Sequence, residues 1–378
     1  MPKYDFLIVG AGLFGSVFAR QLTDAGARCR VIEKRNHIGG NCYTENQQGI
    51  HVHRYGPHIF HTNNETIWEY VNRFVSFNRF TYRPRVNYRG RFYSFPINLM
   101  TLNQLWGVTN PFEANQRLKQ ERVAIENPSN LEEWALSQVG RELYETFIYG
   151  YTKKQWGCEP SALPTSIIRR IPVRLTWNDD YFNDTYCGIP KGGYTQLFDR
   201  LLEGIPVEYG VDFIQGQEHL EKETTKVVYT GPLDCLFDFQ FGANEWRGLK
   251  FEHQTMDVSD YQGVAAINYT DHDVPYTRTI EHKHFDAVQT SHTVVTKEYP
   301  AKWEIGNDMY YPINQSHNEA LQKKYFDLLP DNYITGGRLA EYKYYDMHQV
   351  IGSALKKAAD TIRAGNPSRD RSTIRFSA

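Results

Sequence analysis

Three glycines near the start of the chain have the spacing of a phosphate-binding turn. Gly10, Gly12 and Gly15 follow the apolar run 6–9 and open a stretch with helical spacing. Such glycines allow a tight turn and let the backbone approach a pyrophosphate, which the N-terminus of the following helix stabilises. Glu33 lies 18 residues beyond Gly15 (33 − 15), where its carboxylate can accept hydrogen bonds from an adenosine ribose. These residues predict a dinucleotide site for NAD or FAD.

The segment RNHIGGN at 35–41 narrows this choice. It places two more glycines shortly after the acidic residue, as in flavoproteins of the amine-oxidase type, and so favours FAD over NAD. A glycine turn without any ligand is the alternative, but the order of strand, turn, helix and strand makes it the weaker interpretation.

Arginines beside proline and tyrosine recur along the chain, whereas no Ser/His/Asp set and no HExxH motif is present. Arginine binds phosphate oxygens with two parallel hydrogen bonds and keeps its charge at any working pH. Each of these residues taken alone is more typical of a surface or packing position. Their recurrence in a chain with a net charge of −2 predicts one diphosphate-binding cleft, built from Arg170, Tyr181, Arg278, Tyr311, Arg338, Tyr344 and Asp346.

Two kinds of residue have a simpler interpretation. The histidine pairs His58/His61 and His282/His284 lack supporting cysteine or carboxylate ligands, so no metal site is predicted. In the segment YGYTKKQWG at 149–157, Trp156 is either a stray surface aromatic or a platform for a flat ligand. The two lysines beside it are interpreted as solvated charges.

The composition excludes several classes of protein. The 42 basic and 44 acidic residues leave no positive surplus for nucleic-acid binding. The five cysteines are scattered and form no CxxC motif, which favours a reducing compartment. We find no signal peptide and no run approaching the ~20 apolar residues of a membrane helix. We therefore expect a soluble cytoplasmic protein with no membrane partner.

The elements that must position these residues alternate between types. The N-terminal motif predicts a βαβ unit, and RPRVNYRGRFYSF at 83–95 predicts a hairpin about Arg-Gly. Helical spacing follows between 99 and 155, then a strand at 226–229. Alternating β-branched runs at 264–269, 277–283 and 292–299 predict an antiparallel set. A last helix carries one apolar face, Met347, Val350, Ile351, Ala354, Leu355 and Ala358.

Ten motifs in a fixed order resemble those of the bacterial UDP-galactopyranose mutase family. The likeness covers residues 4–359 and rests on GLFG, EKRNHIGGN, YGPHIFHT, GYTKKQWG, RRIPVR, YTGPLD, VPYTR, EHKHF, TVVTKEYP and GGRLAEYKYYDM. It implies an α/β fold with a Rossmann-like FAD-binding domain, an inserted helical domain and a six-stranded antiparallel sheet. The expected boundaries are 1–80, 190–240 and 320–364 for the FAD domain, 97–175 for the helical domain with a mobile loop at 166–178, and 81–96, 176–189 and 241–319 for the sheet domain, followed by a disordered tail at 365–378.

The resemblance also implies an activity. Such enzymes interconvert UDP-galactopyranose and UDP-galactofuranose, a precursor of cell-surface polysaccharide, without net redox change. Reduced FAD acts through N5 as nucleophile on the anomeric carbon, and UDP is the leaving group. The alternatives are a flavin-dependent oxidoreductase of the amine-oxidase type and a non-enzymatic protein of the same fold. The choice between galactose and N-acetylgalactosamine stays open, and a homodimer or higher homo-oligomer is expected.

Carried over motif by motif, the resemblance assigns roles to individual residues. Arg170 is expected on the mobile loop, Arg278 opposite it on the diphosphate, and His58 beside the isoalloxazine. The expected cofactor-binding residues are Gly10, Gly12, Leu13, Phe14, Gly15, Glu33, Lys34, Gly40, Asn41, His58, Arg338 and Met347. The expected substrate-binding residues are Phe147, Tyr151, Thr152, Trp156, Arg170, Tyr181, Arg247, Asn268, Arg278, Tyr311, Tyr344 and Asp346, with Trp156 on the uracil.

Overall fold

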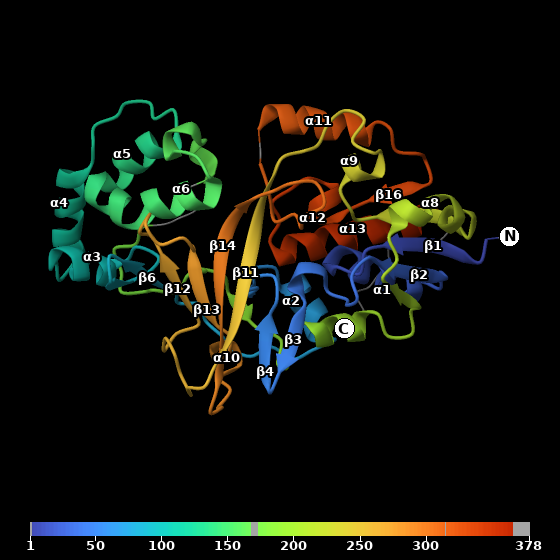
Figure 1. Ribbon diagram of the computed structural model, residues 1–378, viewed down its shortest axis with the longest axis horizontal. Helices are drawn as coiled ribbons and strands as arrows, with labels where there is room; N and C mark the ends of the chain where they lie inside the picture. Colours follow the sequence, from blue (N-terminus) through green and yellow to red (C-terminus); the bar gives the residue numbers. More distant parts are fainter. Residues whose placement is uncertain (1, 168–172, 314, 366–378) are drawn as a thin grey trace.

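A parallel sheet of five strands carries the glycine turn (Figure 1). The computed structural model describes residues 2–167, 173–313 and 315–365 of the chain. The strand order is β16-β10-β1-β2-β9, and every neighbouring pair is parallel, so the carboxyl ends of the strands meet at one edge. The strands are β1 (Tyr4–Val9), β2 (Cys29–Glu33), β9 (Val207–Tyr209), β10 (Thr224–Tyr229) and β16 (Tyr333–Thr335).

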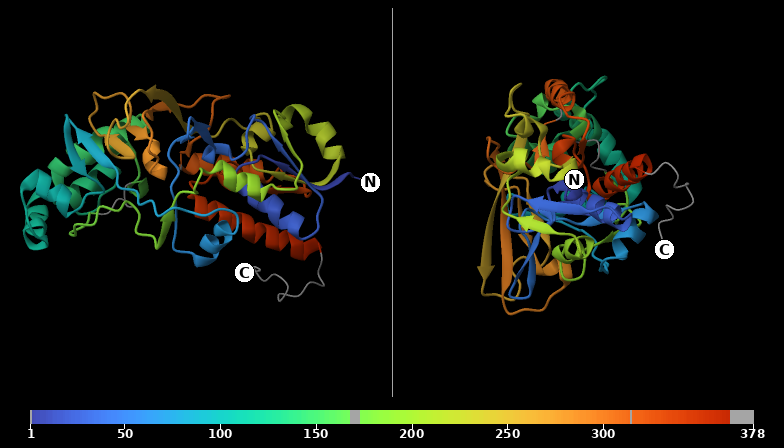
Figure 2. Two further views of the ribbon diagram at one scale, coloured as in Figure 1. Left: turned by 90° about the horizontal axis from the view of Figure 1, so that it is seen from below. Right: turned by 90° about the vertical axis from the view of Figure 1, so that its right-hand side faces the viewer.

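Two helices from opposite ends of the chain lie side by side against this sheet, α1 (Leu13–Asp24) and α13 (Met347–Gly365) (Figure 2). The apolar face predicted for the last helix is confirmed: all its members from Val350 onward are buried, and Met347 packs against the same core. The parallel sheet and its helices form the α/β part of the molecule. Its other helices are α2 (Glu65–Asn72), α7 (Thr195–Leu201), α8 (Phe213–Lys222), α9 (Leu233–Leu236), α11 (Ser316–Phe326) and α12 (Gly337–Ala340).

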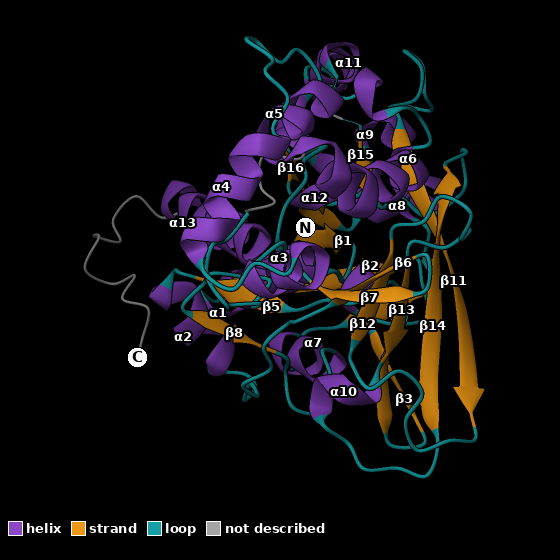
Figure 3. Ribbon diagram, turned by 90° about the vertical axis from the view of Figure 1, so that its left-hand side faces the viewer, coloured by secondary structure: helices purple, strands orange, loops and turns teal. Residues whose placement is uncertain are grey.

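The second sheet has seven strands in the order β15-β11-β14-β13-β12-β6-β7, with the long β11 and β14 side by side (Figure 3). The expectation of six antiparallel strands is therefore wrong in two respects. The short β15 adds a seventh strand, and β6 pairs with β12 in parallel. The strands are β6 (Arg85–Tyr88), β7 (Arg91–Ser94), β11 (Trp246–Met256), β12 (Ala266–Tyr269), β13 (Arg278–Glu281), β14 (Thr293–Lys302) and β15 (Tyr311–Pro312).

Short elements join the two sheets. The hairpin of β3 (Thr44–Gln47) and β4 (Ile50–His53) follows the 3-10 turn η1 (Gly40–Cys42), while α10 (Lys283–Asp286) packs on β4. A second antiparallel pair joins β5 (Phe60–Thr62) to β8 (Tyr186–Gly188).

The helical part has a hydrophobic core of its own and stands apart at one end of the molecule (Figure 1). Asparagine side chains cap its first helices: Asn98 accepts from two backbone N–H groups, and Asn110 and Asn130 each accept from one. A π-helical turn precedes the last helix of this part. The elements are α3 (Leu99–Trp106), α4 (Pro111–Glu121), α5 (Leu131–Leu143), η2 (Tyr144–Tyr149), α6 (Gly150–Trp156), η3 (Pro160–Ala162) and η4 (Thr165–Ile167).

The arrangement confirms the predicted fold class, a Rossmann-like α/β part with an inserted helical part and a mostly antiparallel sheet. The exact domain boundaries stay a prediction, and the tail at 366–378 lies outside the described residues. Among the helices of the described part, none has the length and apolar character needed to cross a bilayer.

Candidate active site

The glycine turn leaves the first turn of α1 open to an anion. Gly12 is the N-cap residue, has no side chain to cap the helix, and no acidic residue follows in the first turn. Gly15 cannot be larger, because a Cβ there would lie 2.0 Å from the carbonyl oxygen of Gly10. The turn therefore presents backbone N–H groups and a helix dipole with space beside them, which fits a pyrophosphate.

Glu33 has a structural task that the sequence did not indicate. Its Oε2 accepts from the backbone N–H of Ala11 at 2.8 Å, and its Oε1 accepts from that of Arg35 at 2.9 Å. The carboxylate thereby ties the glycine turn to the end of β2. Each carboxylate oxygen has a second lone pair, so both can still accept hydrogen bonds from ribose hydroxyls.

Of the predicted cofactor residues between 13 and 41, all but one lie around this turn. Gly40 lies next to Gly12, Leu13 and Phe14 are buried, and Asn41 accepts from Arg35 at 3.1 Å. The exception is Lys34, whose side chain is 76% exposed and pairs with Asp212 at 3.0 Å.

A row of polar side chains crosses the second sheet. The registers of β12, β13 and β14 place Asn268 opposite Arg278 and Arg278 opposite Glu298. One terminal nitrogen of Arg278 donates to both oxygens of the fully buried Glu298 carboxylate, at 2.7 and 2.8 Å. Among the described residues, neither Nε of Arg278 nor Oδ1 of Asn268 has a hydrogen-bond partner, although both atoms are buried. Buried polar atoms need partners, so this row fits a ligand that offers an anionic acceptor to Nε of Arg278 and a donor, such as a hydroxyl group, to Oδ1 of Asn268.

Glu298 holds the charge on Arg278. Burial is the largest single effect and opposes that charge, but the carboxylate of Glu298, with smaller contributions from Tyr151, Tyr82 and Tyr311, holds the pKa of Arg278 well above its ordinary value. The pair therefore presents a permanent guanidinium whose remaining N–H groups are fixed in direction.

Tyrosines gather around this guanidinium. Tyr311 stacks on Tyr344 with ring centres 5.7 Å apart, and Tyr181 packs edge-on against Tyr82 at 5.3 Å. Burial raises the pKa of Tyr151 and Tyr311 well above the ordinary value, with a further contribution from nearby Glu298. Neutral phenols keep their protons and can donate hydrogen bonds to phosphate oxygens.

Helix α6 presents the predicted base-binding residues. Tyr151 and Trp156 are partly buried, and Trp156 packs against the helical core. Thr152 is buried, as is Phe147 in the preceding turn, which meets Tyr93 edge-on at 5.3 Å.

Arg247 lies at the end of α6. Its Nε donates to the carbonyl oxygen of Gln155 at 2.9 Å, and its guanidinium lies against Gly157. Gly157 ends the helix in the left-handed conformation, with φ of 69°.

The interpretation of Lys154 as a solvated charge is wrong, whereas Lys153 is a partly exposed charge in a surface ion pair. Lys153 pairs with Glu159 at 2.5 Å and donates to the Tyr149 hydroxyl at 3.2 Å. Lys154 points inward, and its Nζ donates to backbone carbonyl oxygens of the β12–β13 loop. Spacing along the helix could not reveal this, because the acceptors are more than a hundred residues away in the sequence.

Two buried histidines, His53 and His282, and the half-buried His253 form a hydrogen-bonded network next to His58. The backbone N–H of His58 donates to Nδ1 of His53, and that of His53 donates to Nδ1 of His282. Nε2 of His282 and Nδ1 of His253 both lie 2.7 Å from the Thr296 hydroxyl. Since Nδ1 of His53 and of His282 accepts, each ring carries its proton on Nε2.

His58 lies between the two halves of the site. Burial, assisted by the charges of Arg338 and Arg278, lowers its pKa to about 4. Arg338 is held by the carbonyl oxygens of Tyr310 and Met309. His58 is therefore neutral near pH 7.

Asp346 lies beside histidines at the start of α13. Potential ligand atoms of Asp346, His61 and His348 lie within 4.8 Å of one another. His61 is already engaged, since its Nδ1 is 2.8 Å from Asp184. Arg170, predicted to close on the diphosphate, lies outside the described residues.

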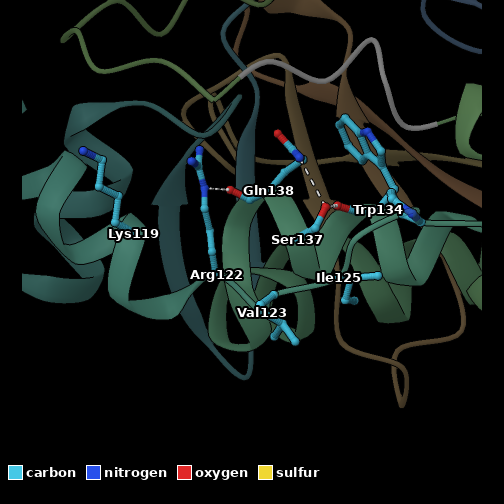
Figure 4. A pocket seen from close by; sticks show the side chains of 9 residues that line it. Lys119, Arg122, Val123, Ile125, Trp134, Ser137 and Gln138 are labelled. Atoms are coloured by element: carbon cyan, nitrogen blue, oxygen red, sulfur yellow. Dashed lines mark hydrogen bonds between the residues drawn. The ribbon is translucent and has the colours of Figure 1, made fainter.

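A surface hollow on α4 and α5 lies in the helical part, and no predicted site residue lines it (Figure 4). Its polar groups bind one another: Arg122 Nε donates to the Gln138 carbonyl at 2.7 Å, and Ser137 Oγ to that of Trp134 at 2.7 Å. The hollow is therefore distinct from the candidate site around Arg278.

Sequence reasoning missed Glu298 and Tyr82. Glu298 stands in the β-branched run TVVTKEYP, where an acidic residue at a buried position is a signal for a paired charge. Tyr82 offered no such signal.

Comparison with known proteins gives consistent matches. The family model described as UDP-galactopyranose mutase matches residues 146–344, and that of the NAD(P)-binding Rossmann-like domain matches residues 8–74. A protein of Klebsiella pneumoniae named probable UDP-galactopyranose mutase is 42% identical over 95% of this chain and 94% of its own. An Escherichia coli dTDP-fucopyranose mutase is 39% identical over 93% and 97%, respectively. A crystal structure of reduced UDP-galactopyranose mutase shares the fold, with a TM-score of 0.73 at 15% identity over 100% of this chain and 97% of that chain.

We predict that acid weakens the fold through the buried histidines. Burial lowers the pKa of His282 to about 3 and that of His253 to about 4. An unfolded histidine titrates near 6.5, so between about pH 6.5 and about pH 4 the unfolded chain binds more protons, and stability falls as pH falls. Each such histidine contributes up to about 1.4 kcal/mol per pH unit.

The measurement is the free energy of unfolding in urea across this pH range. His282→Gln should reduce the dependence on pH, whereas His219→Gln, at a side chain 80% exposed, is the matched control. An equal pH dependence in wild type and His282→Gln would contradict the prediction.

Proposed function

Because the chain belongs to the UDP-galactopyranose mutase family, we propose that it interconverts UDP-galactopyranose and UDP-galactofuranose. It is an isomerase, so substrate and product have the same oxidation state. The observation that supports this function best is the row formed by Asn268, Arg278 and Glu298, in which a buried guanidinium retains donor capacity toward a ligand. The amine-oxidase alternative is less well supported, because the family match covers the segment that carries this row.

The cofactor proposed for the glycine turn is FAD. Gly10, Gly12 and the first turn of α1 would hold the pyrophosphate, and Glu33 would hold the ribose, with Arg338, Met347 and His58 toward the flavin ring. When bound and reduced, the flavin supplies the nucleophile for the anomeric carbon. A neutral His58 adds no positive charge beside Arg338 and Arg278.

The protein's own part is to hold UDP while its bond to the sugar is broken. Arg278 would bind the diphosphate through its remaining N–H groups while Glu298 fixes its direction. Donors that are oriented before the reaction stabilise the developing charge without reorganising. Arg170 is proposed as the second arginine, and Tyr181, Tyr311 and Tyr344 as hydrogen-bond donors to the phosphates.

The uridine would lie against α6. Trp156 and Phe147 provide flat apolar surfaces, while Tyr151 and Thr152 provide polar groups in the first turn of the helix and Arg247 provides one at its C-terminal end. Asp346 is proposed at the border between substrate and flavin. A cytoplasmic homo-oligomer stays a prediction.

The decisive experiment incubates the reduced protein with UDP-galactofuranose and separates the products by ion-pair chromatography. We expect UDP-galactopyranose, and only after the flavin has been reduced. Parallel incubations with UDP-galactopyranose and dTDP-fucopyranose rank the substrates, because a relative is named for the second. Equal rates with oxidised and reduced protein, or steady consumption of an electron acceptor, would overturn the proposal.

We predict that Arg278→Lys keeps the fold and the flavin but loses turnover. A lysine ammonium can still pair with Glu298, so no buried carboxylate is stranded, but it lacks the second branch needed to reach a phosphate. The expected loss in kcat is on the order of a hundredfold. Arg117→Lys, at an arginine paired with Glu121 on α4, is the control. Turnover of Arg278→Lys above about a tenth of wild type would show that the guanidinium does not act on the leaving group.

We predict that Gly12→Ala lowers the flavin content while the apoprotein still folds. The added methyl group meets nothing in the protein closer than 3.9 Å, so stability should change by about 1 kcal/mol or less. The same group fills the space in which the backbone would approach the pyrophosphate. The ratio of flavin absorbance to protein and the unfolding midpoint measure both effects. Gly352→Ala in α13, whose Cβ would lie 3.4 Å from Ile67, should keep its flavin. Wild-type flavin content in Gly12→Ala would refute this placement of the cofactor.

A further inference from the structure

The side chain of Lys154 ends in a ring of four backbone carbonyl oxygens. Its Nζ lies 2.8 Å from the oxygens of Tyr269 and Asp271, and 2.9 Å from those of Val274 and Tyr276. All four residues lie between the end of β12 and the start of β13 or at the strand end itself. One ammonium group therefore contacts the backbone at both ends and in the middle of the loop between β12 and β13.

The ring requires a cation. An ammonium group has three N–H donors and no acceptor, so it can serve four converging carbonyl oxygens when one of its hydrogens is shared between two of them. Carbonyl groups that face one another without a donor would lose hydrogen bonds that water gave them in the unfolded chain. Burial lowers the pKa of Lys154 to about 8, and Asp271 counteracts the effect, so the group is charged near neutral pH.

The ring joins two parts of the candidate site. Lys154 belongs to α6, which carries Tyr151 and Trp156. The loop is flanked by Asn268, one residue before the first carbonyl of the ring, and by Arg278, two residues after the last. The position of the base-binding helix relative to the diphosphate-binding row therefore depends on this contact.

Neighbouring contacts make the junction tight. A Cβ on Gly150 would lie 2.2 Å from the carbonyl oxygen of Thr270, so the helix begins directly against the loop backbone. The Thr270 hydroxyl donates to the carbonyl oxygen of Thr146 at 2.6 Å. A shift of the loop would therefore be transmitted to α6.

We propose that Lys154 is a positioning residue, which fixes the hairpin of Arg278 relative to the helix of Trp156 by occupying a monovalent-cation site made of main-chain carbonyls. The effects on turnover and on UDP binding rest on the proposed function, whereas the effect on the loop does not.

The first test is Lys154→Ala in the full-length flavin-loaded protein. We expect kcat/KM for UDP-galactofuranose to fall about a hundredfold, as for a small misplacement of a reacting group, and UDP to bind more weakly by calorimetry. Hydrogen exchange of the amides at 270–277 should accelerate. Lys153→Ala, next to it in the sequence but paired with exposed Glu159, should leave all three quantities unchanged.

The second test restores the cation from solution. Carbonyl rings replace the hydration shell of a small monovalent ion, so ammonium or potassium chloride should recover much of the loss in Lys154→Ala. Tetramethylammonium chloride at the same ionic strength should not, because its methyl groups cannot donate hydrogen bonds and do not fit. Recovery by all three salts alike, or by none, would overturn the cation site. Unchanged kcat/KM, UDP affinity and exchange in Lys154→Ala would overturn the positioning role.

If Lys154→Ala does not fold, Lys154→Arg serves as the test of the positioning role. Its planar guanidinium keeps the charge but cannot sit at the centre of the ring. We expect an unfolding midpoint near that of wild type with a raised KM and faster exchange at 270–277; unchanged values would overturn the proposal. A wild-type protein that fails to convert UDP-galactofuranose would refute the proposed function instead, and the exchange measurement at 270–277 would still test Lys154.

Discussion

The pairing of Arg278 with Glu298 is the constraint on which the candidate site depends. A buried guanidinium is stabilised when an opposite charge accompanies it, and here that charge is the carboxylate of Glu298, fully buried on the adjacent strand. Glu298 uses one terminal nitrogen of Arg278 and leaves Nε without a partner among the described residues. The carboxylate stabilises the charge of Arg278, but Nε remains available to a ligand. Such a pair can bind an anion and later release it.

The surrounding architecture brings the other groups of the candidate site to Arg278. The second sheet aligns the row, the helical part supplies aromatic and hydroxyl groups above it, and the parallel sheet presents the glycine turn. Tyr181 packs against the cores of both the α/β part and the helical part, and Lys154 ties the helical part to the β12–β13 loop. Each of the three parts thus contributes side chains to the site, which lies where the parts meet. The histidines next to His58 are neutral and add no positive charge there.

Local patterns in the sequence were enough for some of these features. The spacing of Gly10, Gly12 and Gly15 with Glu33 predicted the turn and its strands, and the apolar face of α13 was read from helical periodicity. The partner of Arg278 could not be predicted in this way, since it depends on the register between β13 and β14. The same reason explains the parallel pairing of β6 with β12 and the wrong interpretation of Lys154. Their partners are distant in sequence, and no periodicity encodes such contacts.

The pairing of β6 with β12 also bears on the order in which the chain can fold. Residues 85–94 form one end of a sheet whose next strand begins at Ala266, and the parallel sheet likewise waits for β10 and β16. The helical part, by contrast, has its own core within one continuous segment and can form from contacts between near neighbours. During synthesis, when domains fold from the N-terminus onward, the helices that would hold the nucleotide base are complete while the strands that would hold the diphosphate have not yet been made. The site is therefore assembled last, by the docking of a late sheet onto an early helical unit.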